Sequence, residues 1–391
     1  MRPLVAVLST GTELMRGRSV DTHLGHFARA IERIGLEVDF HATCGDDFAR
    51  IVDELKLAAA RADVILFSGG LGPTEDDLTR AAVSEAFHRE LKFRPVLWKT
   101  IRARFRIPMA AINRRQAFLP DGAEALPNPN GSAPGFALEA GGVKFFALPG
   151  PPREMIPMFE AHVMPRLPRA ARFALWEGAS VGLPEGDVDT IAHRIVKGAS
   201  YGLTVKSGVV NIAVRGGRIR PIVDRLRRAL GSNLLEAPTL AASVAKLLGR
   251  RTIAVAESCT GGLIASKLTD VPGISANLIE ACVTYSNGSK VARLGVPPGL
   301  IQRHGAVSAQ VVLEMADGIR RTSGADIGVA VTGIAGPDGG SKEKPVGLVY
   351  HAVSAGGRTR VERRVWPGGR SDVKERAANF ALDLLRRRLQ A

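Results

Sequence analysis

The chain has 391 residues, of which 45% are hydrophobic and 23% charged, which excludes an intrinsically disordered protein. Because domains commonly hold about 100–200 residues, this length predicts two or three of them. The 53 Lys and Arg residues against 38 Asp and Glu give a net charge of +15. The basic residues are spread along the chain, so a solvated basic surface is at least as good an explanation as a nucleic-acid-binding patch.

The cysteine count and the lengths of the apolar runs indicate the cellular compartment. Cys44, Cys259 and Cys282 show no Cys-x-x-Cys spacing, so neither a disulfide framework nor a cysteine zinc site is expected. No apolar run approaches the roughly 20 residues that span a bilayer, and the first apolar run is too short for a signal peptide. We expect a cytoplasmic protein without a membrane partner.

The first part of the chain alternates between strand and helix patterns. The predicted strands are residues 4–9, 36–43, 63–68 and 145–148, and the predicted helices are 21–34, 46–60 and one from residue 153. This βαβαβ order predicts a mainly parallel sheet with helices on both faces.

The rest of the chain contains a short module and a second region with α/β rhythm. The module has predicted strands at 174–181 and 209–214, helices at 187–196 and 219–230, and a linker at 233–238. Beyond it, strands are predicted at 252–256, 278–285, 326–331, 346–353 and 359–366, and helices at 241–248, 260–268, 309–321 and 372–388. The fold class is therefore α/β: two α/β domains, 1–168 and 239–391, with mainly parallel sheets, joined by a small α+β module, 169–238.

A glycine-rich loop, residues 68–79 (SGGLGPTEDDLT), follows a buried strand and precedes a helix. Gly70 and Gly72 let the backbone approach a ligand closely, and a helix N-terminus suits a phosphate. Asp76 and Asp77, with Glu13 from a neighbouring strand end, are candidate ligands for Mg²⁺ or a similar divalent cation. The alternative is a glycine-rich turn with an Asp helix cap.

Two further loops follow predicted strands. The rigid turn at 148–152 (LPGPP) contains Gly150, and spacing alone does not separate a ligand role from a turn that ends a strand. The glycine-dense loop at 331–340 could wrap around a substrate, or be a loop without a ligand.

A second strand-to-helix turn, residues 256–262 (AESCTGG), holds two candidate nucleophiles, Ser258 and Cys259. Lys290 at a later strand end could act as the base for Ser258 if burial or positive charge lowers its pKa. The helix opening at Gly261-Gly262 would offer N–H donors to an oxyanion or to a substrate phosphate. The alternative is that Ser258 or Thr260 merely caps the helix.

At these residues the sequence resembles the CinA family of competence/damage-inducible proteins over essentially its whole length. The motifs AESCTGG (256–262), VTYSNGSK (283–290), HGAVS (304–308), VTGIAGPDGG (331–340) and EKPVG (343–347) are similar to the family's C-terminal nicotinamide-nucleotide amidohydrolase domain. The motifs GTEL (11–14), GGLGPTEDDLT (69–79), NRRQA (113–117) and LPGPPREM (148–155) are similar to a domain shared with molybdopterin-binding proteins. The middle segment corresponds to a small KH-like domain.

The resemblance implies two activities. One is deamidation of nicotinamide mononucleotide to nicotinate mononucleotide and ammonia, a step of pyridine nucleotide salvage, without a cofactor and with Ser258, Tyr285 and Lys290 as the catalytic centre. The other is a metal-dependent ADP-ribose pyrophosphatase in the N-terminal domain. The substrate-contact candidates are Thr260, Gly261, Gly262, Thr332, Gly333 and Arg370 in the first site, and Gly70, Gly72, Thr74 and Gly150 in the second. The chain departs from the usual family pattern at His23, in place of Asn, and at Gly369, in place of Asp.

The expected partners are nicotinamide mononucleotide, ADP-ribose and a second copy of the chain in a homodimer. A nucleic-acid-associated accessory protein is the alternative, but no GxxG loop, which a KH module uses to clamp phosphates, occurs in 170–240. Nucleic acid is therefore not an expected partner. Pterin binding, the third hypothesis, would leave the amidohydrolase motifs unexplained.

Overall fold

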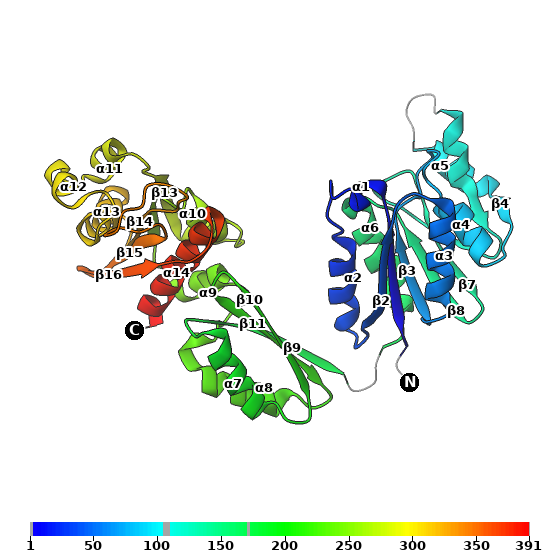
Figure 1. The fold of residues 1–391 in the computed structure, drawn as a ribbon, viewed down its shortest axis with the longest axis horizontal. Helices are drawn as coiled ribbons and strands as arrows, with labels where there is room; N and C mark the ends of the chain where they lie inside the picture. Colours follow the sequence, from blue (N-terminus) through cyan, green and yellow to red (C-terminus); the bar gives the residue numbers. More distant parts are fainter. Residues whose placement is uncertain (1–2, 105–109, 170–172, 391) are drawn as a thin grey trace. The chain divides into compact units, whose positions relative to one another are not determined.

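The computed structural model describes residues 3–104, 110–169 and 173–390 (Figure 1). The chain divides into two compact units, Met1–Leu175 and Trp176–Ala391. Each unit has its own sheet and its own apolar cores.

The first unit is built on a six-stranded sheet of order β2-β1-β3-β8-β7-β6. Its strands are β1 (Val5–Thr10), β2 (Val38–Cys44), β3 (Val64–Ser68), β6 (Glu124–Leu126), β7 (Gly135–Ala140) and β8 (Val143–Leu148). The pairings from β2 to β8 are parallel, and β7 and β6 join antiparallel. β1 and β3 are buried along their whole length, as expected for parallel strands covered on both faces.

Helices cover both faces of this sheet. They are α2 (His23–Glu32), α3 (Phe48–Ala59), α4 (Thr79–Ala86) and α6 (Pro152–Met158); the unit also contains the short α1 (Thr12–Met15) and α5 (Pro95–Arg102). Phe27 of α2 and Met155 of α6 lie in the core on one face, and Leu55 of α3 and Val83 of α4 lie in the core on the other. A separate two-stranded ribbon is formed by β4 (Leu91–Phe93) and β5 (Phe118–Pro120).

The second unit contains a five-stranded sheet of order β13-β12-β14-β15-β16. Its strands are β12 (Ile253–Glu257), β13 (Leu278–Val283), β14 (Ile327–Gly333), β15 (Leu348–Ala355) and β16 (Arg358–Val365). β12 pairs in parallel with β13 and with β14. β15 pairs antiparallel with β14 on one side and with β16 on the other.

Two cores sandwich this sheet between helices. α9 (Leu240–Leu248), α10 (Leu263–Thr269) and α14 (Arg370–Gln390) contribute to one core, and α11 (Asn287–Leu294), α12 (Pro298–His304) and α13 (Ala309–Ser323) to the other. The carboxyl ends of β12 and β14, where parallel sheets place their ligands, lead into the loops of the candidate site.

The small module consists of β9 (Ala174–Val181), α7 (Glu185–Ile195), β10 (Ser200–Lys206), β11 (Val209–Gly216) and α8 (Arg220–Leu230). Its three strands have the order β10-β11-β9. The segment predicted to be a linker is partly packed: Leu235 is buried, and its N–H donates to the carbonyl of Ala179 at 2.8 Å. Ala179, Val181 and Leu235 share the core of α9 and α14, so the module has no separate core at this end.

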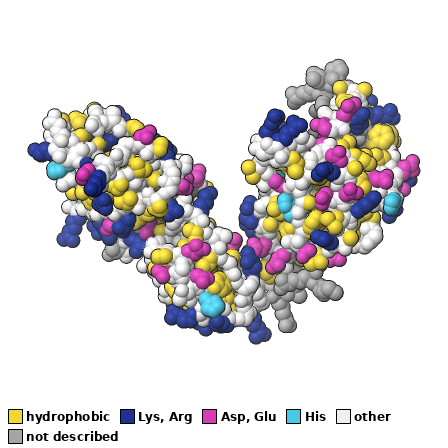
Figure 2. All heavy atoms as spheres, in the orientation of Figure 1, with side chains coloured by type: hydrophobic (Ala, Val, Ile, Leu, Met, Phe, Trp, Pro, Cys, Tyr) yellow, Lys and Arg dark blue, Asp and Glu magenta, His cyan; other side chains and the backbone are white. Residues whose placement is uncertain are grey.

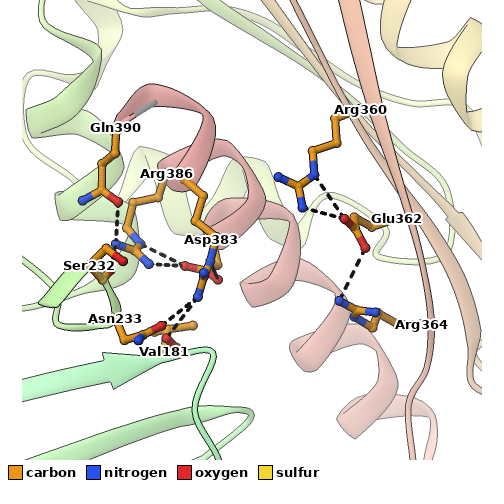
Figure 3. A network of polar contacts seen from close by, with 10 residues as sticks. Val181, Ser232, Asn233, Arg360, Glu362, Arg364, Asp383, Arg386 and Gln390 are labelled. Carbon is orange, nitrogen blue, oxygen red and sulfur yellow. Dashed lines mark hydrogen bonds and ion pairs between the residues drawn. The ribbon is translucent and has the colours of Figure 1, made fainter. Parts of the chain in front are cut away.

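A buried ion-pair network on α14 ties the module to the five-stranded sheet's helices (Figure 3). Asp383 and Arg386 are almost fully buried and lie 2.6 Å apart, and Arg387 bonds to the second Asp383 oxygen at 2.8 Å. Arg386 also donates to the carbonyl of Ser232 at 2.6 Å, and Arg387 to the side chain of Asn233 at 3.0 Å. Because each buried charge has a partner, the desolvation cost is compensated at this contact.

The predicted α/β fold class is confirmed. The first unit's large sheet is mainly parallel, whereas the five-stranded sheet of the second unit pairs β13, β12 and β14 in parallel and adds β15 and β16 antiparallel. β10 was not predicted, because most of its residues are exposed and it lacks the alternation of a half-buried strand. α10 begins at Leu263 and not at Thr260, since Gly261 and Gly262 adopt φ of +62° and +92°, outside the helical region.

None of the described helices combines the length and apolar character needed to cross a bilayer. On the face drawn in Figure 2, the Lys and Arg side chains are spread over both units and do not gather into one patch.

Candidate active site

The candidate site of the second unit starts at the loop between β12 and α10. Ser258 follows the buried end of β12 directly and is 7% exposed. Lys290 lies in α11, which begins after β13, the parallel neighbour of β12. Because neighbouring parallel strands end at the same edge of the sheet, the two side chains meet although 32 residues separate them.

The Lys290 amine has three polar neighbours. Nζ lies 3.1 Å from Oγ of Ser258, 2.7 Å from the carbonyl oxygen of Thr284 and 3.2 Å from that of Tyr285. The two carbonyls can only accept hydrogen bonds, whereas the hydroxyl can also donate. An ammonium can donate to all three oxygens, and a neutral amine, with two N–H donors and one lone pair, satisfies them equally when Ser258 donates to the lone pair.

Burial favours that neutral form. Lys290 is 1% exposed, and desolvation of the ammonium lowers its pKa below the ordinary value, opposed by a weaker effect of Cys259. A lysine can act as a base for serine only if its pKa is lowered, and burial lowers the pKa of Lys290.

Cys259, the rival nucleophile, is in a different environment. Its side chain is 5% exposed and belongs to the apolar core, and burial raises the pKa of its thiol to about 12. The thiolate is the reactive form of cysteine, and a thiol with this pKa stays protonated near neutral pH. The geometry therefore favours Ser258.

Glu257, the last residue of β12, caps the N-terminus of α10 with its buried carboxylate. Its carboxylate is 1% exposed and accepts hydrogen bonds from the N–H groups of Gly262, Ile264 and Ala265 at 3.0, 3.1 and 2.9 Å. The N–H of Gly261 donates to the carbonyl of Ser258 at 3.1 Å. The expectation that the helix opening offers its N–H groups to an oxyanion or a phosphate is therefore wrong, because these donors are already engaged.

We expect Glu257→Gln to lower the free energy of unfolding by about 1–3 kcal/mol, since one carboxylate oxygen becomes an NH₂ group that faces buried N–H donors. Urea unfolding of the full chain measures the loss. Glu280→Gln, at a partly exposed position in β13 with only a 4.0 Å contact to Arg293, is the matched control and should change stability by less than about 0.5 kcal/mol. Equal stability of the two variants would show that the cap contributes nothing.

The backbone carbonyl and the side-chain hydroxyl of Tyr285 have different hydrogen-bond partners. Its carbonyl accepts from Lys290, whereas its hydroxyl accepts from Arg370 at 2.9 Å, and the residue is 59% exposed. Arg370 also donates to the carbonyl of Gly336 at 2.7 Å. The Tyr285 hydroxyl thus hydrogen-bonds to Arg370 and not to Ser258 or Lys290. Its catalytic role stays a prediction.

Of the other predicted contact residues of this site, Thr332 and Gly333 have structural partners, whereas the Thr260 hydroxyl has none among the described residues. Thr260 is fully buried, and its hydroxyl has no hydrogen-bond partner among the described residues. Thr332 donates to the carbonyl of Ala306 at 3.0 Å. A Cβ at Gly333 would stand 2.7 Å from the carbonyl oxygen of Leu348, so close strand packing already requires glycine there. Substrate contacts of these residues stay predictions.

The glycine loop of the first unit is organised by its own side chains. Asp77 accepts from the N–H groups of Gly72 and Thr74 at 2.7 and 2.8 Å and from the Thr74 hydroxyl at 2.6 Å. Asp76 is the alternative acceptor for the single proton of this hydroxyl. Buried Arg80 donates to the carbonyls of Leu71 and Gly72, both at 2.6 Å. Asp77 therefore shapes the loop with the oxygens that were expected to bind a metal.

Glu13, Asp76 and Asp77 do not form a ready-made metal centre. Across 3–104, 110–169 and 173–390, no three His, Cys, Asp or Glu side chains lie close enough to hold a metal ion. A metal-dependent pyrophosphatase activity of this unit remains a prediction.

Gly150 and His23 do lie beside the glycine loop. A Cβ on Gly150 would stand 3.7 Å from the Cα of Gly69. Nδ1 of His23 lies 2.8 Å from the hydroxyl of Ser68, which is 3.2 Å from that of Ser9. Burial lowers the pKa of His23. A Cβ on Gly70, whose φ is +60°, would stand 2.4 Å from the hydroxyl of Thr79, so glycine is required there.

Sequence reasoning missed Glu257 and Arg80 as residues that build these sites. The available signal for Glu257 was a carboxylate at the end of a buried strand, directly before Ser258. In its second unit the protein thus has an α/β fold with a serine–lysine pair of the kind found in nucleophilic hydrolases.

Comparison with known proteins identifies the family. The CinA C-terminal domain matches residues 237–389, and a domain described as "Probable molybdopterin binding domain" matches 6–169. A competence-damage inducible protein of Alkaliphilus metalliredigens is 40% identical, covering 98% of each chain, and one of Clostridium botulinum is 38% identical, covering 98% of this chain and 99% of its own. The crystal structure of the competence/damage inducible protein CihA from Agrobacterium tumefaciens is 40% identical, covers 39% of this chain and 98% of its own, and has a TM-score of 0.37. The chain belongs to the CinA family of competence/damage-inducible proteins.

Proposed function

We propose that the second unit hydrolyses the carboxamide of nicotinamide mononucleotide to nicotinate mononucleotide and ammonia. The observation that carries this proposal is the buried Ser258–Lys290 pair, with 3.1 Å between Oγ and Nζ. The choice of substrate rests on the similarity of the surrounding motifs to the nicotinamide-nucleotide amidohydrolase domain of the family.

In the first half-reaction, neutral Lys290 takes the proton of Ser258 while Oγ attacks the carboxamide carbon. The resulting Lys290 ammonium then gives a proton to the departing nitrogen, the C–N bond breaks, and ammonia leaves an ester on Ser258. Because the carbonyls of Thr284 and Tyr285 can accept from the ammonium, the charged form is held in place during this interval.

In the second half-reaction, Lys290 is neutral again after ammonia has left with its proton, and it activates a water that attacks the ester. Oγ of Ser258 takes the proton back and nicotinate mononucleotide is released. The oxyanion formed in each half needs donors outside α10, whose first N–H groups bind Glu257.

The test is ammonia release by the full chain from nicotinamide mononucleotide, with nicotinate mononucleotide followed by chromatography. We expect both products in equal amounts, and no loss of rate in excess chelator. Absence of both products from a folded protein between about pH 6 and about pH 9 would refute the proposed function.

A further inference from the structure

A mononucleotide substrate carries a phosphate that the active site has to hold. Helix N-termini commonly bind phosphates through free N–H groups. In α10 those groups donate to Glu257, whose carboxylate also adds negative charge at that position. The phosphate therefore needs other groups to hold it, and a cation near the catalytic loop would supply the opposite charge.

The contacts of the described residues bring Lys290, Arg370 and Lys374 close to this loop, and the first two already have partners. Lys290 is 1% exposed and contacts Ser258 and two carbonyls. Arg370 bonds to the carbonyl of Gly336 and to the hydroxyl of Tyr285. The third is Lys374: its Nζ lies 3.7 Å from the point where a Cβ on Gly261 would stand.

Lys374 differs from Lys290 and Arg370 because its ammonium group is free to bind an anion. Its ammonium makes no ion pair or hydrogen bond with any of the described residues, whereas its neighbour Glu375 pairs with Lys267 at 2.8 Å. Lys374 and Arg370 stand four residues apart in the first two turns of α14, so both project from one face of the helix. Arg370 contacts Tyr285 and Lys374 approaches Gly261, so this face borders the catalytic loop.

We propose that Lys374 binds the phosphate monoester of the substrate, with Arg370 one turn away on the same helix face. This inference rests on the proposed function, because it assigns the phosphate of the same substrate. A dianionic phosphate beside an ammonium gains a charge-assisted hydrogen bond. The site would therefore select a nucleotide over the corresponding nucleoside.

The experiment compares nicotinamide mononucleotide with nicotinamide riboside, which lacks the phosphate. For the mononucleotide we expect Lys374→Gln to lower kcat/KM by about 10- to 100-fold, mainly through KM, and to leave the riboside unaffected. Lys374→Arg should restore most of the loss. Lys267→Gln is the matched control: this lysine lies on α10, pairs with Glu375 and should leave both substrates unaffected.

Two outcomes overturn the proposal. An equal loss for both substrates would show that Lys374 acts on the loop and not on the phosphate, and no loss for either would show that it has no role. If wild-type protein deamidates neither substrate, the proposed function fails by itself, and binding of inorganic phosphate then decides on the site. Phosphate should raise the thermal unfolding temperature of the wild type and of Lys267→Gln but not of Lys374→Gln, which would support an anion site at Lys374. If phosphate does not stabilise the wild type, the site is refuted.

Discussion

Replacement of Ser258 by Ala is expected to lower the deamidation rate by about 10³-fold or more, while binding of nicotinamide mononucleotide persists. The hydroxyl is the only nucleophile that lies within 3.1 Å of the Lys290 amine among the described residues, and loss of a nucleophile usually costs several orders of magnitude. Rate and substrate affinity are measured separately, by product formation and by calorimetry.

Cys259→Ala is the matched control, since Cys259 is adjacent in the same turn. We expect it to keep most of the activity, because its thiol is buried and its pKa is about 12. Rapid quenching of the wild-type reaction followed by mass spectrometry should find the nicotinoyl ester on the peptide containing Ser258. A folded but inactive Cys259→Ala protein together with an active Ser258→Ala protein would reverse the assignment.

Replacement of Lys290 by Met should reduce kcat by a similar factor of about 10³ or more. Methionine fills the buried position with an unbranched side chain but cannot accept the proton of Ser258. Lys267→Met, on the surface of the neighbouring α10, should retain activity. Circular dichroism of both variants separates loss of the base from loss of the fold.

The pH dependence tests the same lysine without a mutation. Burial disfavours the ammonium and lowers the pKa of Lys290, so the neutral base is present at a lower pH than for an exposed lysine. Below that pKa, kcat/KM should rise with pH in proportion to the neutral fraction and then level off. The residual rate of Lys290→Met should lack this rise. A wild-type kcat/KM that falls with increasing pH throughout would contradict a lysine base.

Composition and periodicity predicted the α/β class and the positions of most strands, but β7 and α11, the helix that carries Lys290, were not predicted. Continuous apolar runs such as Val5–Thr10 and Ile253–Glu257 form fully buried strands, because a parallel sheet covered on both faces needs apolar residues at every position. Glycine-rich turns after these strands also marked both candidate sites, since a strand end followed by a helix requires particular backbone conformations.

Which side chains meet depends on how the elements pack, and burial by that packing lowers the pKa of Lys290. The contact between Ser258 and Lys290 depends on the parallel pairing of β12 with β13, and the lowered pKa of Lys290 depends on burial by residues distant in the sequence. The local sequence pattern also does not show that the Glu257 carboxylate accepts hydrogen bonds from α10, or that the Asp77 carboxylate accepts them from its own loop. Nor does it show that Lys374 of α14 lies close to Gly261. Local periodicity records which face of an element is buried, whereas desolvation and long-range contacts arise only when the elements pack together.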